Sequence, residues 1–267
     1  MINVVVAGAA GRMGRRLVDN ILNSDDLKLA GAFEISGCPL LGSDAGSVAC
    51  GKESGIKITT AGDGLPANTD AVITFATGGV IELVREAVKI GASVVIGTTA
   101  LPKEVLAELS ELAANGARIV QAGNMSVGAN LLMSLAKKAA SLLGEDCDIE
   151  ITEMHHNQKK DAPSGTAMML AKAVCDAKGW DEDVIRHGRE GVIGARPRKE
   201  IGMHSLRGGD VVGDHTVIFA MNGERIELTH RASSRDMFSN GALRAVRFLA
   251  DAEPGLYDMQ DVLNLKN

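Results

Sequence analysis

The residues with the clearest capacity for chemistry lie in one short stretch, residues 153–166, which reads EMHHNQKKDAPSGT. His155 and His156 carry side chains that can give or take a proton near pH 7. Lys159 can fix a carboxylate or act as an acid. Proton donors and cations gathered in one loop predict proton transfer to or from a substrate that carries negative charge.

The same stretch predicts an anion site. Pro163 and Ser164 precede a helical pattern over residues 167–175, and serine is a preferred N-cap residue. We therefore expect the backbone N–H groups of Gly165 and Thr166 to point outward and bind a carboxylate. The alternative is that the histidines are ordinary loop residues and the serine only a cap. A zinc site is disfavoured, because the sequence has no HExxH motif and no nearby cysteine completes a ligand set.

A second candidate site begins at the first predicted strand, which runs directly into the glycine-rich segment 8–14. Gly8 would allow a tight turn, Gly11 the approach of a pyrophosphate, and Gly14 close packing of helix on strand. Glu34 follows about 20 residues later, where an acidic side chain can bind ribose hydroxyls. The motif is GxxGxxG rather than GxGxxG and could alone be a structural turn. Its context of strand, helix and acidic residue predicts a nicotinamide dinucleotide site.

The residues around the predicted ribose site favour NADH as the cofactor. A carboxylate at Glu34 would repel the 2′-phosphate of NADPH, and Ile35 supplies no cation to neutralise it. Arg12, Arg15 and Arg16 lie close enough in sequence to leave room for NADPH. Their alternative role is that of solvated helix charges.

The elements that must position these residues change in kind along the chain. Up to residue 125, short β-branched runs alternate with amphipathic helical patterns, which predicts a parallel sheet covered by helices. The predicted strands are Ile2–Ala7, Leu27–Glu34, Ala71–Phe75, Ser93–Ile96 and Arg118–Gln121. The three helices between them carry apolar stripes, and Pro102 suits the first position of the third helix.

Beyond residue 125 the pattern predicts a second domain. An apolar helix, a strand and then three strands without intervening helices indicate a mostly antiparallel or mixed open sheet. These elements are expected at Val127–Leu143, Asp148–Met154, Glu200–Leu206, Val211–Met221 and Arg225–Arg231. Gly208-Gly209 and Asn222-Gly223 provide turn residues for hairpins, the latter with the stronger signal. A last helix, Asn240–Ala250, is expected to cover the first domain.

Length and composition are consistent with a two-domain α/β enzyme. We expect residues 1–125, completed by 233–267, to bind the dinucleotide, and residues 126–232 to bind substrate. With 28 Lys+Arg against 34 Asp+Glu the formal charge is −6, which argues against nucleic-acid and membrane surfaces. The four cysteines show no metal spacing or disulfide framework. No targeting or membrane-spanning pattern is evident, so a cytoplasmic location is expected.

The histidine-rich stretch has the form Glu-x-His-His-x-x-Lys-x-Asp-Ala-Pro-Ser-Gly-Thr-Ala and resembles 4-hydroxy-tetrahydrodipicolinate reductase, also called dihydrodipicolinate reductase. This motif is highly specific to that family, whereas the glycine motif is shared by many dehydrogenases. The resemblance runs nearly end to end. It includes the further segments 8–14, 41–44, 97–99, 124–128 and 207–213.

The resemblance implies an enzyme of the diaminopimelate route to lysine that transfers a hydride to a cyclic, unsaturated dicarboxylate. It makes His155 the catalytic acid or base and Lys159 a proton donor, and it places His156, Gly165 and Thr166 at the substrate. The implied cofactor positions are Gly8, Ala9, Ala10, Gly11, Arg12, Met13, Gly14, Glu34, Gly97, Thr98, Thr99, Ala122, Gly123, Asn124 and Met125. The implied architecture is a Rossmann domain joined to an α+β domain whose sheet forms a homotetramer.

Two departures and two alternatives accompany the resemblance. Ile35 replaces a basic residue that many members carry, which argues against dual NADH and NADPH use, and residues 75–79 lack an expected proline. One alternative is another NAD(P)-dependent dehydrogenase of a small carboxylate. The other is a non-catalytic NAD-binding regulator, which would not need His155 and Lys159 beside an anion site.

Some residues are not promoted to the site. Four histidines are interpreted as hydrogen-bonded sheet or loop residues: His187, His204, His215 and His230. A basic stretch is interpreted as a solvated loop that could also steer a dianionic substrate. It consists of Arg186, Arg189, Arg196, Arg198 and Lys199.

Overall fold

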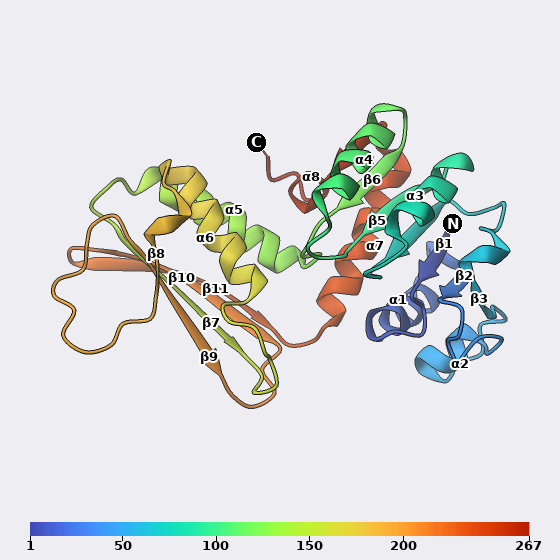
Figure 1. Cartoon of the computed structure of the whole chain (residues 1–267), viewed down its shortest axis with the longest axis horizontal. Coiled ribbons are helices and arrows are strands. Elements are labelled where there is room, and N and C mark those ends of the chain that lie inside the picture. Colours follow the sequence, from blue (N-terminus) through green and yellow to red (C-terminus); the bar gives the residue numbers. More distant parts are fainter. Residues whose placement is uncertain (267) are drawn as a thin grey trace. The chain divides into compact units, whose positions relative to one another are not determined.

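The computed structural model describes residues 1–266 and divides into two compact units (Figure 1). Unit 1 comprises residues 1–126 and the segment from Asp236 onward, and unit 2 comprises Val127–Arg235. None of the helices within the described part of the chain has the length and apolar character needed to span a bilayer.

Unit 1 is built on a parallel sheet of seven strands in the order β12-β6-β5-β4-β1-β2-β3. The strands are β1 (Ile2–Ala7), β2 (Leu27–Glu34), β3 (Ile58–Thr60), β4 (Ala71–Thr74), β5 (Ser93–Ile96), β6 (Arg118–Gln121) and β12 (Gly255–Tyr257). Runs such as Val4–Val6 are wholly buried, as expected where helices cover both faces of a parallel sheet. The five predicted strands are confirmed to within one residue. The three-residue strands β3 and β12 were not predicted, because such short runs carry no usable period.

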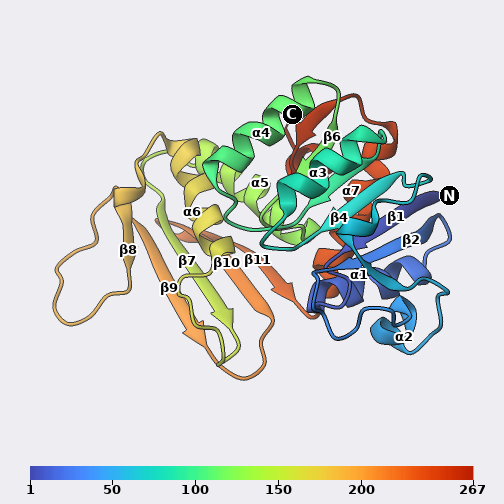
Figure 2. The same cartoon turned by 45° about the vertical axis from the view of Figure 1, so that its right-hand side comes forward.

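Helices cover the sheet of unit 1 (Figures 1 and 2). They are α1 (Arg12–Leu22), α2 (Ala45–Cys50), α3 (Val80–Lys89), α4 (Lys103–Ala114), α7 (Asp236–Asp251) and α8 (Met259–Val262), with a 3-10 turn η1 (Ala61–Asp63). Leu17 of α1 and Leu243 of α7 share one core cluster, which confirms that the last long helix covers this unit. Val84 and Leu109 belong to a second cluster, formed with α3 and α4. Pro102 is the N-cap of α4 rather than its first helical residue, because its ψ of 149° is extended.

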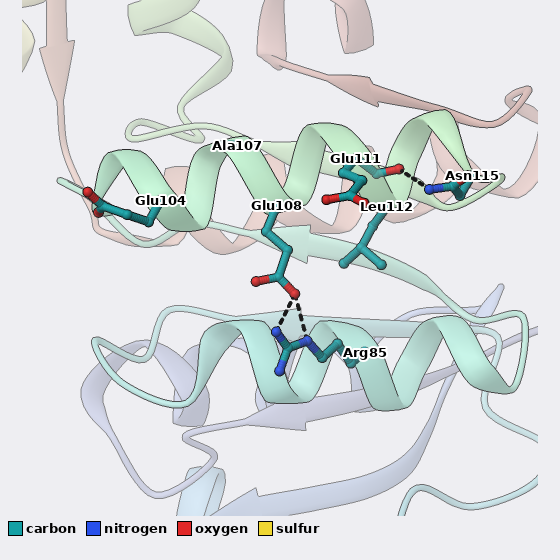
Figure 3. A pocket seen from close by; sticks show the side chains of 7 residues that line it. All are labelled: Arg85, Glu104, Ala107, Glu108, Glu111, Leu112 and Asn115. Atoms are coloured by element: carbon teal, nitrogen blue, oxygen red, sulfur yellow. Dashed lines mark hydrogen bonds and ion pairs between the residues drawn. The ribbon is translucent and has the colours of Figure 1, made fainter.

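Helices α3 and α4 lie side by side and enclose a surface groove of about 600 Å³ (Figure 3). Arg85 of α3 donates from Nε to Glu108 of α4 over 2.6 Å and so joins the two helices. Glu104 and Glu111 add further negative charge to the α4 side. These elements carry none of the predicted site residues, and the groove is a feature of the helix layer.

Unit 2 is a five-stranded sheet, in the order β11-β10-β7-β9-β8, packed against two helices. Its elements are α5 (Val127–Leu142), β7 (Asp148–His155), α6 (Gly165–Lys178), η2 (Glu182–Val184), β8 (Ile185–His187), β9 (Ile201–Arg207), β10 (Gly213–Met221) and β11 (Glu224–Ala232). Strand β10 pairs antiparallel with β11 and β7, whereas β9 pairs parallel with β7 and β8. The sheet is therefore mixed, and the predicted fold class is confirmed.

One predicted hairpin is confirmed and the other is wrong. Met221 pairs with Glu224 across Asn222-Gly223, and Gly223 has a φ of +89°, as a tight hairpin turn requires. Gly208-Gly209 does not close a hairpin, because β7 lies between β9 and β10 in the sheet. Gly209 does have a positive φ of 53°, so a local turn is present. The chain after this turn crosses over β7 to form β10 on the other side of it.

Candidate active site

One face of β7 changes from apolar to ionisable as the strand approaches its end. Alternate residues of a strand share a face, so Ile149, Ile151, Glu153 and His155 all point the same way. The two isoleucines are fully buried in the core beneath α5 and α6. Glu153 and His155 therefore continue the core face to one end of unit 2.

The neighbouring strands add polar residues at the same level. On β9, Ser205 is in register with Glu153 and Arg207 with His155. On β10, His215 is in register with Glu153. The pairing of the three strands thus gathers a carboxylate, a guanidinium, a hydroxyl and two imidazoles at one edge of the hydrophobic core.

Glu153 is the centre of this arrangement and is only 1% exposed. Its carboxylate accepts two hydrogen bonds from Arg207, at 2.9 and 2.8 Å, and one from Nδ1 of His155 at 2.6 Å. The backbone N–H of Ser164 donates a fourth, at 3.2 Å. Burial raises the pKa of Glu153, but the bonds from Arg207 and His155 lower it to about 2. The carboxylate is therefore ionised throughout the physiological range.

His155 has its orientation set by this carboxylate. An ionised carboxylate only accepts hydrogen bonds, so Nδ1 carries a hydrogen and Nε2 is the nitrogen left to exchange a proton with a ligand. The side chain is 12% exposed. Burial lowers the pKa of His155, while the bond to Glu153 opposes that shift. A Cβ at Gly213 would come within 3.0 Å of Nε2, so glycine at that position leaves room for the ring.

Ser164 begins helix α6, as the sequence predicted. Its Oγ accepts a hydrogen bond from the backbone N–H of Ala167 at 3.1 Å and contacts Nε2 of His215 at 2.9 Å. Gly165 and Thr166 are the first two residues of the helix. At this position backbone N–H groups point out of the helix N-terminus, which is the positive end of the helix dipole. The residues assigned to an anion site therefore have the local structure that such a site needs.

Lys159 lies in the loop between β7 and α6. Its Nζ donates to both carboxylate oxygens of Asp161, at 2.9 and 2.8 Å, and its side chain is 19% exposed. The hydrogen bond from Lys159 lowers the pKa of Asp161. Arg207 also donates to the backbone carbonyl of Asp161 at 2.7 Å. The backbone carbonyl of His156 accepts a hydrogen bond from the backbone N–H of Lys159 at 3.1 Å. The loop is therefore bound to the same arginine that holds Glu153.

The residue pattern of the sequence predicted a site in this loop, but no role for Glu153 or Arg207. The available signal was the two-residue spacing of Glu153 and His155, which puts both side chains on one face of a strand. The contribution of Arg207 depends on the parallel pairing of β9 with β7, which the sequence did not predict. The interpretation of His215 as a hydrogen-bonded sheet residue is confirmed by its contact with Ser164.

The interpretation of the basic stretch as a solvated loop is wrong for two of its members. Arg189 pairs with Glu150 and Glu200, both at 2.6 Å, and its side chain is 25% exposed. Arg196 is 18% exposed and donates to Glu150 at 3.0 Å. Glu150 was not recognised as a partner because it lies on β7, 39 residues before Arg189 and 46 before Arg196, and Glu200 lies 11 residues after Arg189, outside any regular helix or strand spacing. Arg198 does fit the interpretation, because its ion pair is largely exposed.

Unit 1 brings the predicted dinucleotide residues to one edge of its sheet. Gly8 follows β1 with a φ of +76°, and a Cβ on Gly14 would overlap the Gly8 carbonyl, so both positions require glycine. The Oε1 atom of Glu34, the last residue of β2, accepts from the backbone N–H of Ala10 at 2.9 Å. The acidic residue and the glycine loop are therefore in direct contact.

The remaining predicted cofactor residues follow β5 and β6. Residues 97–99 come directly after β5, and Thr98 donates from its hydroxyl to the carbonyl of Ala76 at 2.6 Å. Residues 122–125 come directly after β6. Because all these strands are parallel, their carboxyl ends share one edge, and the strand order reverses between β1 and β4 as in dinucleotide-binding folds.

Comparisons with known proteins agree with this geometry. Residues 2–125 match the family model of the dihydrodipicolinate reductase N-terminus, and residues 128–263 match that of its C-terminus. A 4-hydroxy-tetrahydrodipicolinate reductase from Syntrophotalea carbinolica is 49% identical, with all of both chains covered. One from Burkholderia ambifaria is also 49% identical, over 99% of this chain and 100% of the relative.

A solved structure is similar as well. The dipicolinate-bound dihydrodipicolinate reductase from Paenisporosarcina sp. TG-14 has a TM-score of 0.77 and 25% identity, with 98% of each chain covered. A Rossmann-type domain in a reductase indicates a nicotinamide cofactor. The matches confirm the predicted reductase of the diaminopimelate route and do not favour a different dehydrogenase or a non-catalytic regulator. The chain belongs to the dihydrodipicolinate reductase family.

Proposed function

We propose that the chain uses NADH to reduce 4-hydroxy-tetrahydrodipicolinate, via dihydrodipicolinate, to tetrahydrodipicolinate, with His155 as the proton donor. The observation that carries this assignment is the fixed imidazole of His155, which is bound through Nδ1 to Glu153 at 2.6 Å. His155 is the last residue of β7, and the loop that follows it leads to the N-terminus of α6. The names of the relatives support the substrate. The dipicolinate in the solved relative supports a ring with two carboxylates.

The chemistry explains why these residue types occur together. Hydride addition to a conjugated ring leaves negative charge, which a positioned acid neutralises by protonation. Nε2 of His155 is the nitrogen that can supply this proton. Lys159 holds a substrate carboxylate or supplies a second proton. Before substrate binds, Asp161 keeps the ammonium group of Lys159 in place. His156, Gly165 and Thr166 bind the carboxylates of the substrate.

The dinucleotide binds at the carboxyl edge of the unit 1 sheet. The positive φ of Gly8 permits the turn, and a Cβ at Gly11 or Gly14 would meet the Gly8 carbonyl, so glycine at these positions lets the pyrophosphate approach the start of α1. The other positions assigned to the cofactor are Ala9, Ala10, Arg12, Met13, Glu34, 97–99 and 122–125. When bound, the nicotinamide supplies the hydride. The dinucleotide that donates the hydride therefore binds to residues of unit 1, and the dicarboxylate substrate binds to residues of unit 2.

The preference for NADH rests on Glu34 and its neighbour. The carboxylate lies against the glycine loop through Ala10, where ribose hydroxyls are bound in such folds. Ile35 is 77% exposed and offers no charge to a 2′-phosphate. By the family resemblance we also infer a cytoplasmic homotetramer assembled through unit 2. Sedimentation of the purified chain tests the oligomeric state.

A coupled assay tests the activity. The chain is mixed with a synthase that makes the ring from pyruvate and aspartate semialdehyde, and nicotinamide absorbance is followed with each cofactor. We expect turnover with both components present and a higher kcat/KM with NADH. The Lys159→Met variant should lose about 10²-fold or more in kcat, whereas Lys160→Met, its exposed neighbour, should not. Absence of synthase-dependent oxidation would overturn the proposal.

The cofactor preference has its own test. The double variant Glu34→Gln, Ile35→Arg removes the repelling charge and adds a cation, so kcat/KM should rise for NADPH relative to NADH. Isothermal titration of each cofactor separates binding from turnover. An unchanged ratio of the two dissociation constants would exclude Glu34 as the residue that selects the cofactor.

A further inference from the structure

The proton donor is held by a buried ion pair. Glu153 and Arg207 form two parallel hydrogen bonds, a bidentate geometry that fixes both groups. The Glu153 side chain is fully buried, and that of Arg207 is 22% exposed. A carboxylate buried at this depth would be costly without its partner, so the pair stays ionised and in place.

The pair is connected to three parts of the site at once. Glu153 binds Nδ1 of His155 and the backbone N–H of Ser164, the N-cap of α6. Arg207 binds the backbone carbonyl of Asp161, whose side chain holds Lys159. One ion pair thus contacts the histidine, the helix start and the lysine loop.

We propose that Glu153 and Arg207 are positioning residues that fix the reactive tautomer of His155 and set the pH range over which it donates a proton. This inference deepens the proposed function and rests on it for the role of His155. An ionised Glu153 holds the hydrogen on Nδ1 and favours the imidazolium. Arg207 keeps Glu153 ionised and, as a nearby cation, opposes the imidazolium.

Several charged or titratable groups face His155 from the surrounding elements. Glu153 lies on β7, Arg207 on β9 and His215 on β10, where the two imidazole rings are 5.2 Å apart in an edge-on arrangement. Lys159 with its partner Asp161 faces it from the loop. Burial lowers the pKa of His155, Glu153 raises it, and Lys159 and Arg207 lower it. The two members of the ion pair therefore act on the imidazole in opposite directions.

This opposition gives a test that a purely structural role would fail. Glu153→Gln should lower the pKa of His155, because it removes the carboxylate that favours the imidazolium, whereas Arg207→Gln should raise it. Since a donor must be protonated, the limb on which kcat falls with rising pH should move to lower pH in the first variant and to higher pH in the second. At pH 7, Glu153→Gln should cost roughly 10- to 100-fold in kcat and recover as the pH falls.

Two readouts are needed on the full-length enzyme. Nuclear magnetic resonance of labelled imidazoles gives the pKa of His155 without any turnover, and kcat against pH gives the catalytic limb. Glu150→Gln on the opposite face of the sheet is the matched control and should leave both unchanged. If a single variant does not fold, the double variant Glu153→Gln, Arg207→Gln, which leaves no buried charge unpaired, replaces it. In that variant the loss of the Glu153 hydrogen bond and charge outweighs the loss of the more weakly acting Arg207 charge, so the limb should still move to lower pH.

The outcomes distinguish the two levels of the proposal. A His155 pKa that is the same in the wild type and in Glu153→Gln overturns the positioning role. A loss of kcat by the same factor at every pH does so as well. Full activity of a variant lacking His155 would instead overturn the proposed function, whatever its neighbours do to the imidazole.

Discussion

Two clusters built from the same residue types lie on opposite faces of the unit 2 sheet. We call Glu153, Arg207 and His155 the site cluster. The scaffold cluster consists of Glu150, Arg189, Arg196 and His204. Glu150 and Glu153 are an odd number of residues apart on β7, so they point to opposite faces. In each cluster burial raises the glutamate pKa, and arginine and histidine hydrogen bonds lower it to about 2.

The clusters differ in how the histidine is bound and in what lies beside it. His155 uses Nδ1 toward Glu153, whereas His204 uses Nε2 toward Glu150 at 2.8 Å. The site cluster also reaches the N-cap of α6 and the Lys159 loop. The scaffold cluster reaches Glu200, only 6% exposed, and the loop that leads to β9. A buried Glu–Arg–His group is therefore not in itself evidence of catalysis. What distinguishes the site cluster is its contact with the N-cap of α6 and with the Lys159 loop.

The largest expected effect separates the two histidines. Removing the proposed proton donor with His155→Gln should lower kcat by roughly 10²–10⁴-fold, the usual contribution of general acid catalysis. His204→Gln should leave kcat nearly unchanged, because its ring is used within the scaffold cluster. Cofactor titration should show the same NADH affinity in both. Equal kcat in the two variants would remove the distinction between the clusters.

Acid should act on both clusters alike. A carboxyl group with a lowered folded pKa contributes stability that is present above its unfolded value of 4.5 and lost as the pH falls toward about 2. A shift of that size corresponds to about 3 kcal/mol per glutamate. His215, with a pKa lowered to about 4 by burial, adds a separate loss that begins below its ordinary value of 6.5.

The difference between two proteins isolates the glutamate part. Urea unfolding of wild type and Glu150→Gln from neutral pH downward should show the variant less stable at pH 7 and less sensitive to acid below pH 4.5. Because His215 is present in both, its loss cancels. Parallel curves would mean that Glu150 has an ordinary pKa in the folded chain.

Much of unit 1 could be predicted from sequence because its signals are local. A β-branched run, a glycine loop and the acidic Glu34 lie within one βαβ unit, and parallel strands bring their carboxyl ends together without further information. The loop around His155 was likewise visible as a cluster in sequence. Ser164, the N-cap of the following helix α6, was predicted from its residue type.

The rest depended on pairings between distant residues. Arg207 meets Glu153 only because β9 runs parallel to β7, and the turn at Gly208-Gly209 suggested a different neighbour. Arg189 and Arg196 looked solvated because their carboxylate partners lie on another strand or beyond the local window. Long-range register sets these contacts, and no residue spacing encodes it.

Loss of an arginine from the scaffold cluster should lower the stability of the fold rather than its activity. Arg189→Ala leaves Glu150 and Glu200 with one cation fewer in a partly buried setting, which should cost about 1–3 kcal/mol in unfolding free energy with little change in kcat. Arg198→Ala is the control, since its pair with Asp146 is 82% and 87% exposed and should contribute nothing measurable. Equal urea midpoints for the two variants would contradict the scaffold role.

The smallest expected effect compares two glycines that make room for these groups. A Cβ at Gly213 would stand 3.0 Å from Nε2 of His155, and one at Gly202 would overlap the carboxylate of Glu150. Neither glycine has a positive φ, so alanine is allowed by the backbone. Gly213→Ala should displace the imidazole by a few tenths of an ångström and lower kcat roughly three- to tenfold, since catalysis depends steeply on placement. Gly202→Ala should lower the thermal midpoint instead and spare kcat. If Gly213→Ala lost stability but kept kcat, the position of Nε2 would not matter, and the site cluster would resemble the scaffold cluster after all.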